Sequence, residues 1–187
     1  MGGPKKLFLV YFYSKLFLHF EKFHGKGRSK PVNDVDAACK LLHDGYDCAM
    51  IDAKEENEEC IPWNTSYNSS TGMGGNNLVD ECTTLNSNSK CGERACIIES
   101  QFVSTLISQY MKGFQKDPAY KHSNGFDIES GCPTKSNSRE SEKSCCGYYP
   151  YRHPYKTYGD ERRCCGLKTY DSKLLECCDD DKTRLTC

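Results

Sequence analysis

The cysteines of this chain constrain its fold more than any other feature. There are 14 in 187 residues. Six of them form three adjacent pairs near the C-terminal end: Cys145-Cys146, Cys164-Cys165 and Cys177-Cys178. Adjacent cysteines cannot sensibly bridge each other, so each pair should tie its segment to two other places. Dense cysteines in an even number are typical of a small domain stapled by disulfides in an oxidising compartment.

Zinc is the competing explanation for dense cysteine. Structural zinc sites usually carry paired cysteines two residues apart, and adjacent cysteines cannot readily both serve one tetrahedral site. That spacing is missing here, so we predict disulfides for all the cysteines: Cys39, Cys48, Cys60, Cys82, Cys91, Cys96, Cys132, Cys145, Cys146, Cys164, Cys165, Cys177, Cys178 and Cys187. Two sequons predict glycosylation at Asn64 and Asn68, and both features favour a secreted, extracellular protein.

The cysteine count also predicts a link between the two halves of the chain. Seven cysteines fall in residues 39–132 and seven in residues 145–187. Because each count is odd, at least one bridge should join the halves, or one thiol on each side is free or intermolecular. Cys187, the last residue, is a natural candidate for an inter-chain or inter-domain bond.

Composition divides the chain into four segments. Residues 1–22 are basic and aromatic, either an imperfect signal peptide or the truncated start of a longer protein. We expect a helical domain over residues 23–132, a linker over residues 133–144 and a di-cysteine tail over residues 145–187. The net charge of −1 argues against nucleic acid. The basic aromatic start is either solvated surface or a face that meets a phospholipid membrane.

Two helices are expected in the second segment. The first runs from about Asn33 or Asp34 to about Ile51, and the second from about Glu93 to Met111, where Gly113 ends it. The apolar positions of the two helices recur at helical spacing: Cys39, Leu42, Tyr46 and Met50 in the first, Cys96, Val103, Ile107, Tyr110 and Met111 in the second. His43 lies beside the first stripe. A surface loop is expected over residues 64–77.

The first predicted helix and the loop before it carry residues that could bind a metal ion and activate water. Gly25 and Gly27 let the loop turn its carbonyl oxygens inward, and Asp44 supplies a carboxylate for a hard cation such as calcium. His43 is placed to deprotonate a water that such a cation holds. Glu99, on the second helix, is the candidate carboxylate to orient His43. Each of these residues is also common in a purely structural role.

This segment resembles secretory phospholipase A2 over about residues 20–132. The spacing from Gly25 to His43, the run from Pro31 to Asp36 and the run from Cys91 to Cys96 before Glu99 carry the resemblance. It implies a mainly α, disulfide-rich fold with a pair of antiparallel helices. It also implies calcium held by Asp44 and by loop carbonyls, those of Phe23, Gly25 and Gly27, with His43 and Glu99 as the catalytic pair.

The chain departs from that family in ways that affect catalysis. The family has two adjacent cysteines where this chain has Cys39 and Lys40, and the loop cysteine that pairs with the second is His24. The cysteine after the catalytic pair is replaced by Tyr46, and its expected partner by Ile98. Two further changes touch the site: the orienting tyrosine appears as Asp47, and the orienting aspartate as Glu99.

The tail resembles the di-cysteine repeats of galaxin and related matrix proteins. The phrase Cys-Cys-Gly, a few residues, Tyr, a few residues, Cys-Cys recurs in outline from residue 145 to residue 178. It implies a β-hairpin-like, cysteine-knotted module linked to matrix assembly. Tyrosines interleaved with arginines and lysines either pack this knot or form an adhesive face.

Two main functions follow. The first is a secreted extracellular matrix, structural or adhesive protein on a degenerate, calcium-holding phospholipase A2-like scaffold, with other matrix proteins or its own copies as partners. The alternative is an active calcium-dependent phospholipase A2 that hydrolyses glycerophospholipid esters with a His-activated water. A toxin or receptor ligand on the same scaffold is a third, weaker idea.

Overall fold

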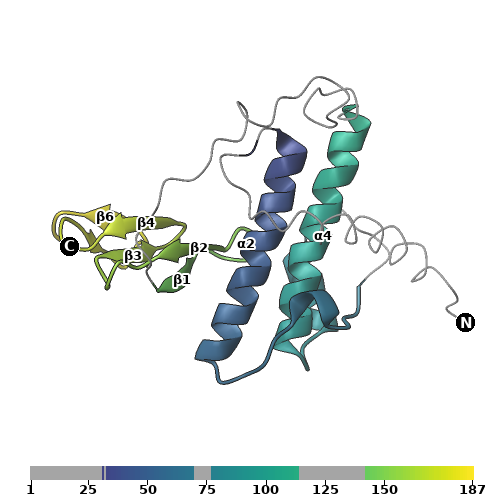
Figure 1. Cartoon of the computed structure of the whole chain (residues 1–187), viewed down its shortest axis with the longest axis horizontal. Helices are drawn as coiled ribbons and strands as arrows, with labels where there is room; N and C mark the ends of the chain where they lie inside the picture. The colour runs from purple at the N-terminus through teal and green to yellow at the C-terminus, as the bar shows by residue number, and fades with distance from the viewer. Residues whose placement is uncertain (1–30, 32, 70–76, 114–141) are drawn as a thin grey trace, which may run out of the picture.

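Two long helices and a ladder of hairpins make up the structure. The computed structural model describes residues 31, 33–69, 77–113 and 142–187. Helices α2 (Asp34–Glu55) and α4 (Lys90–Met111) lie side by side and antiparallel (Figure 1). A 3-10 turn η1 (Pro62–Asn64) and helix α3 (Leu78–Leu85) pack against α4, and the C-terminal strands lie on the outer side of α2.

The ends of both long helices are set by local capping. The side chain of Asn33 accepts a hydrogen bond of 2.9 Å from the backbone N–H of Asp36, so α2 begins where the sequence predicted. Helix α4 begins at Lys90, three residues earlier than predicted, because Ser89 caps it by accepting from Gly92 N–H. Gly113 follows its C-terminus with a φ of +81°.

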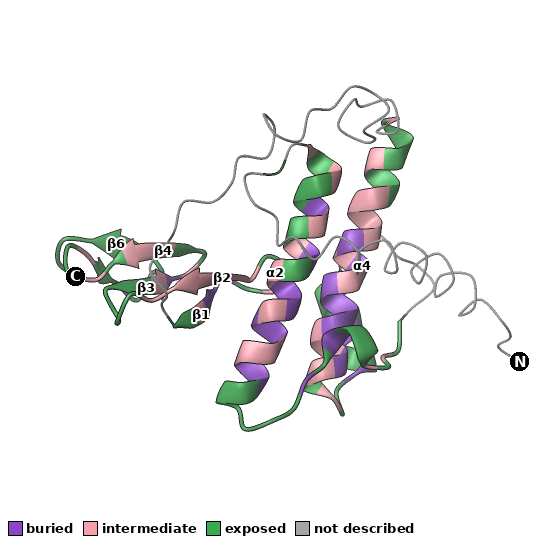
Figure 2. Ribbon diagram, in the orientation of Figure 1, coloured by how far each residue is buried: buried purple, intermediate pink, exposed green. Residues whose placement is uncertain are grey.

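The main core lies between α2 and α4 (Figure 2). Leu42, Tyr46 and Phe102 belong to its largest buried cluster, with small alanines at intervening positions of α2. Gly45 permits the close approach of the two helices, because a Cβ there would lie 3.0 Å from Cγ1 of Ile98. Gly45 and Ile98 therefore face each other across the helix interface.

The buried stripe of α4 is shorter than its sequence pattern predicts. Cys96, Ile97, Ile98 and Phe102 are buried, but Ile107, Tyr110 and Met111 are exposed in the last turns of the helix. Helical periodicity identified the correct element and misplaced the end of its buried face. The loop predicted over residues 64–77 is followed directly by α3, an unpredicted helix that begins at Leu78 and packs on α4.

Three antiparallel hairpins form the tail. They pair β1 (Lys143–Cys146) with β2 (His153–Lys156), β3 (Arg162–Cys165) with β4 (Lys168–Asp171), and β5 (Glu176–Cys177) with β6 (Thr183–Arg184). Gly166 turns the second hairpin with a φ of +56°, and a Cβ there would come within 2.9 Å of Asp181 on the third. Glycine is thus required by the turn and by the contact between hairpins.

Six disulfides connect the described residues. Cys60–Cys91 and Cys82–Cys96 fasten the helical part, and Cys48–Cys145 joins α2 to β1, which confirms the predicted link between the halves. In the tail each doublet bridges to the next: Cys146–Cys164, then Cys165–Cys177, then Cys178–Cys187.

Two cysteine predictions need correction. Cys187 bridges to Cys178 within the last hairpin, so it makes no bond to another chain or to the helical part. Cys39 carries a free thiol, although the sequence assigned all cysteines to bridges. Cys132 lies outside the described residues. The coarse prediction of a small, mainly α, disulfide-rich fold with a hairpin tail is confirmed. In the described ranges no helix is long and apolar enough to cross a membrane.

Candidate functional site

The candidate site is a carboxylate held between the two long helices. Glu99 of α4 accepts hydrogen bonds of 2.6 Å at each of its oxygens, one from the hydroxyl of Tyr46 on α2 and one from that of Tyr67 in the loop after η1. The Tyr46 ring lies beside that of Trp63, with centroids 6.2 Å apart. Both oxygens of Glu99 thus bond to tyrosine hydroxyls, and the pairing of Glu99 with His43 stays a prediction.

The surroundings of Glu99 oppose its ionisation. Burial raises the pKa of the Glu99 carboxyl above its usual value, and the hydrogen bonds from Tyr46 and Tyr67 pull the pKa partly back down. Both donors suit a carboxylate, because each hydroxyl places its proton on a different oxygen. The network positions the two tyrosine side chains and bridges α2 and α4.

Contacts across the helix interface establish the register of α2 against Glu99. The tyrosine that reaches Glu99 is Tyr46, and the residue that faces Ile98 is Gly45. The phospholipase resemblance placed these two roles one residue later, at Asp47 and at Tyr46. These two neighbouring contacts show how α2 and α4 are aligned against each other.

His43 lies beside the face of α2 that packs into the core. Leu42 lies one turn before Tyr46 on the same face of α2, is 5% exposed and belongs to the main core. His43 is exposed on the neighbouring face. Its neighbour Asp44 forms an ion pair with Lys40, one turn earlier on α2.

Calcium binding stays a prediction. The carbonyl ligands expected from Phe23, Gly25 and Gly27 lie outside the described residues, which leaves Asp44 as the one described member of the set. Within the described residues no group of three or more histidine, cysteine or acidic side chains gathers in a way that could hold a metal ion. In the structure the carboxylate of Asp44 forms an ion pair with the ammonium of Lys40.

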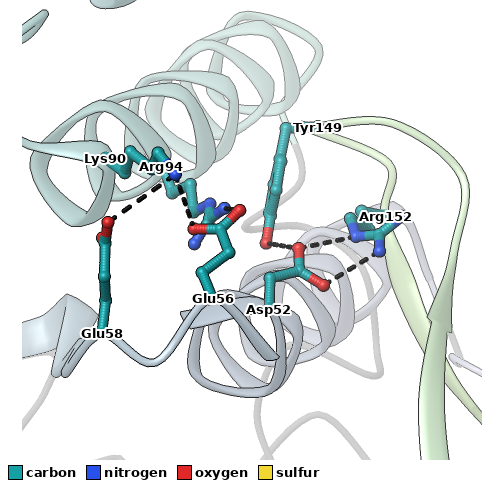
Figure 3. Close-up of polar contacts among 7 residues, drawn as sticks. All are labelled: Asp52, Glu56, Glu58, Lys90, Arg94, Tyr149 and Arg152. Atoms are coloured by element: carbon teal, nitrogen blue, oxygen red, sulfur yellow. Dashed lines mark hydrogen bonds and ion pairs between the residues drawn. The ribbon is translucent and has the colours of Figure 1, made fainter. Parts of the chain in front are cut away.

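A second buried carboxylate joins the helices to the tail. Asp52 of α2 is 7% exposed, and Arg152 approaches it with a two-pronged contact of 2.8 and 2.9 Å (Figure 3). The hydroxyl of Tyr149 donates to the same carboxylate at 2.9 Å. We call these three residues, Asp52, Tyr149 and Arg152, the Asp52 clamp. The bridge Cys48–Cys145 lies one helical turn away along α2.

The Asp52 clamp also inserts a tail residue into the helical part. Tyr149 packs against both buried clusters of the helices. Burial, together with the nearby charge of Asp52, raises the pKa of the Tyr149 hydroxyl, so it acts as a donor. Beside the clamp, Arg94 of α4 bonds Glu56 at the end of α2 (Figure 3).

The two predicted glycosylation sites differ in their surroundings. Asn64 is exposed at the end of η1. Asn68 is exposed too, but its side-chain amide donates to Leu85 O at 3.3 Å, and its backbone N–H and C=O both bond to the side chain of Asn86. An acceptor asparagine must offer its side-chain nitrogen, so Asn64 is the better placed of the two.

The free thiol of Cys39 is poorly suited to chemistry. Burial, with a smaller contribution from Asp36, raises the pKa of Cys39 to about 12. The thiol is therefore neutral at physiological pH, whereas nucleophilic attack and metal binding require the thiolate.

Sequence reasoning missed most partners of these two carboxylates. For Glu99 a signal was present, since Leu42 and Tyr46 belong to the apolar stripe of the first helix and His43 lies beside it. For Asp52 and Arg152 no local signal exists, because the two residues are 100 positions apart in the chain. A comparison of the chain with protein-family models, with curated proteins and with solved structures finds no match.

Proposed function

We propose that this protein is a secreted structural or adhesive protein of the extracellular matrix, whose phospholipase A2-like core does not hydrolyse lipid. The observation that carries the proposal is the Glu99 network: both oxygens of Glu99 accept from tyrosines. A water-activating site of the kind described above needs a histidine against that carboxylate.

The register of α2 supports the same proposal. Under the phospholipase resemblance, a displacement of one residue puts Leu42 at the position of the catalytic histidine and His43 at that of the calcium-binding aspartate. Leucine cannot accept a proton, and its side chain fills the core instead. A scaffold with these residues keeps the helix packing and loses the base that turnover requires.

The tail supports a structural role by its construction. Its hairpins are chained to one another by disulfides and fastened to α2 by Cys48–Cys145 and the Asp52 clamp. Tyr148 and Tyr151 remain exposed in the loop between β1 and β2, close to the attachment, where they can meet a partner. Disulfides throughout the described residues fit the oxidising extracellular space.

Fatty-acid release from phospholipid vesicles, with calcium and with chelator, tests the proposal. We expect no release above that of a heat-inactivated control, and no change in the His43→Gln variant. Calcium-dependent release that His43→Gln abolishes would establish the alternative, an active phospholipase A2.

The adhesive role is tested separately by saturable binding of labelled protein to decellularised matrix, which we expect unlabelled protein to displace. Binding that does not saturate contradicts it.

A further inference from the structure

The turn between β1 and β2 presents two tyrosines to solvent on a fixed backbone. Tyr148 and Tyr151 are 62% and 58% exposed, whereas Tyr149 between them packs against the helices. The backbone N–H of Tyr151 donates to Tyr148 O at 2.8 Å, and Gly147 O accepts from the guanidinium of Arg152 at 2.6 Å. The turn is therefore held at both ends while two phenol rings stay accessible.

One of these exposed phenols has a carboxylate at its hydroxyl. Tyr148 donates to Asp181, in the turn between β5 and β6, at 3.2 Å. Asp181 is held in its turn because its backbone N–H donates to Cys178 O at 3.0 Å, and it lies against Gly166 of the second hairpin. Among the described residues no carboxylate bonds to the hydroxyl of Tyr151. The linked hairpins thus bring an exposed phenol and an exposed acceptor together from 33 positions apart.

This combination favours oxidation of the Tyr148 ring. A phenol that loses an electron becomes a strong acid and must release its proton, and a carboxylate at hydrogen-bond distance can take that proton as a base. Other tyrosines that donate to a carboxylate are less open to solvent: Tyr46 is buried, and Tyr67 and Tyr149 are half-buried. Tyr148 combines the acceptor with a ring whose carbons a second molecule can reach.

The surroundings of Tyr148 let two copies of the chain approach without a competing reductant. Leu167 of the second hairpin is 60% exposed and lies beside Gly147, so Tyr148, Tyr151 and Leu167 offer apolar surface on one end of the tail. Every cysteine of residues 142–187 is bridged. No thiol of the tail is therefore available to reduce a tyrosyl radical before it couples.

We propose that Tyr148 is a site of dityrosine cross-linking between copies of this chain, with Asp181 as its proton acceptor. This inference rests on the matrix role proposed above, and the oxidant is hydrogen peroxide, used by a secreted haem peroxidase. Two phenols each lose one electron and one proton. The two phenoxyl radicals form a bond between the ring carbons ortho to their oxygens, and the hydrogen on each of those carbons moves to its oxygen. Hydrogen peroxide takes up the two electrons and two protons and becomes two molecules of water.

Oxidation of the purified full chain, with its disulfides intact, tests the proposal. The chain is treated with a haem peroxidase and limiting hydrogen peroxide, and the products are separated on denaturing gels after thiol reduction. We expect a dimer that survives reduction and shows dityrosine fluorescence, and peptide mass mapping should place Tyr148 in its main cross-link. If no such dimer forms, or if the main cross-link lacks Tyr148, the proposal is overturned.

Two tyrosine variants locate the cross-link. Tyr148→Phe should lose most of the dimer, because phenylalanine forms no phenoxyl radical. Tyr151→Phe is the matched control, since it removes a phenol of similar exposure from the same turn, and it should keep the dimer. Equal dimer yields in the two variants would contradict the assignment to Tyr148.

Two aspartate variants test the acceptor. Asp181→Asn should slow dimer formation about fivefold, because an amide accepts the phenol proton poorly. Asparagine tolerates the φ of +57° at this position, so the turn should persist. Asp179→Asn removes the same charge from the same turn and should leave the rate unchanged. Equal rates in these two variants would exclude Asp181 as the acceptor.

The matrix role and the cross-link can fail separately. Binding to decellularised matrix is measured on untreated chain, without peroxide or peroxidase. Lack of saturable binding there would contradict the matrix role, whereas the dimer of the purified chain reports on Tyr148 alone.

Discussion

The helical part and the hairpin tail of this chain are held together by different forces. Between α2 and α4 the structure buries leucine, tyrosine, isoleucine and phenylalanine side chains, and the helices approach closely at Gly45. In the tail the buried residues are mostly cysteines, and the large apolar side chains Leu167, Leu174 and Leu185 are exposed. One region is stabilised mainly by apolar burial and the other mainly by covalent links.

The difference shows how a short sequence can be ordered without a core. A two-stranded hairpin is marginally stable alone in water, and the tail consists of three of them. Each doublet supplies one cysteine to the preceding connection and one to the next. Within the described residues, the tail gains apolar burial where it meets the helices, as at Tyr149.

The largest effect should come from cutting the ladder. We expect the double variant Cys146→Ser, Cys164→Ser to lose about 4 kcal/mol of tail stability, since a bridge is the main constraint there. Amide exchange in residues 142–187 should quicken about a thousandfold, while α2 and α4 keep their protection. Replacing Cys82 and Cys96 by serine is the control, with a similar loop length in the helical part. Equal loss of protection in both regions would show that they unfold as one unit.

A smaller effect should come from the contact between the regions. Arg152→Ala leaves Asp52 buried without its cation and should cost about 3 kcal/mol in urea unfolding. That is the lower end of the usual range, because the guanidinium is 24% exposed. Arg163→Ala, at an exposed position of β3, should change stability by less than about 0.5 kcal/mol.

A rescue variant sharpens the test of the Asp52 clamp. Replacing Asp52 by leucine, Arg152 by methionine and Tyr149 by phenylalanine removes both charges together with the hydroxyl that would lose its acceptor, and should restore most of the lost stability. If Arg152→Ala costs no more than Arg163→Ala, the bridge Cys48–Cys145 alone attaches the tail.

The smallest effect concerns a polar group inside the helical part. Because burial raises the pKa of Glu99 in the folded state, folding takes up a proton, and stability should fall as pH rises from the unfolded pKa through the folded one. Glu99→Gln removes that dependence. At pH 4 we expect the free energy of unfolding of Glu99→Gln to lie within about 1 kcal/mol of that of the parent chain. At pH 7 the difference between variant and parent should shift in favour of the variant, because only the parent loses stability as the pH rises.

A tyrosine variant should strengthen the pH dependence of stability that Glu99→Gln removes. Tyr67→Phe removes a hydrogen bond that lowers the pKa of Glu99, so its stability should fall more steeply between pH 4 and pH 7 than that of the parent chain. Urea unfolding across this range measures both variants. Parallel pH curves for Glu99→Gln and the parent would contradict the argument.

The sequence predicted elements better than it predicted register. Both long helices, the cap at Asn33, the glycine after α4 and the hairpin tail followed from local patterns. Because adjacent cysteines do not bridge each other, the sequence predicted that each doublet connects to two other places. The odd number of cysteines in each half predicted a disulfide between the two regions. Ser89 was missed because serines are common in its neighbourhood, and α3 because it is only eight residues long.

The alignment of α2 against α4 could not be read from the sequence, for a physical reason. Leu42 and His43 are neighbours in sequence but lie on adjacent faces of α2, about 100° apart around the helix axis. Which face meets Glu99 depends on the approach at Gly45 and Ile98, residues more than 50 positions apart. The apolar stripe through Leu42 and Tyr46 marked the buried face of α2, and His43 lies beside that stripe.

The order of bridges in the tail has a mechanical consequence. A pull on Cys187 passes through one disulfide to Cys178, along a single peptide bond to Cys177, and so on through each doublet to Cys145 and the helix behind it. The intervening loops carry none of that tension, because a covalent shortcut spans each of them. Under load the tail behaves as a short cable that can barely lengthen, even after its hairpins have been torn open.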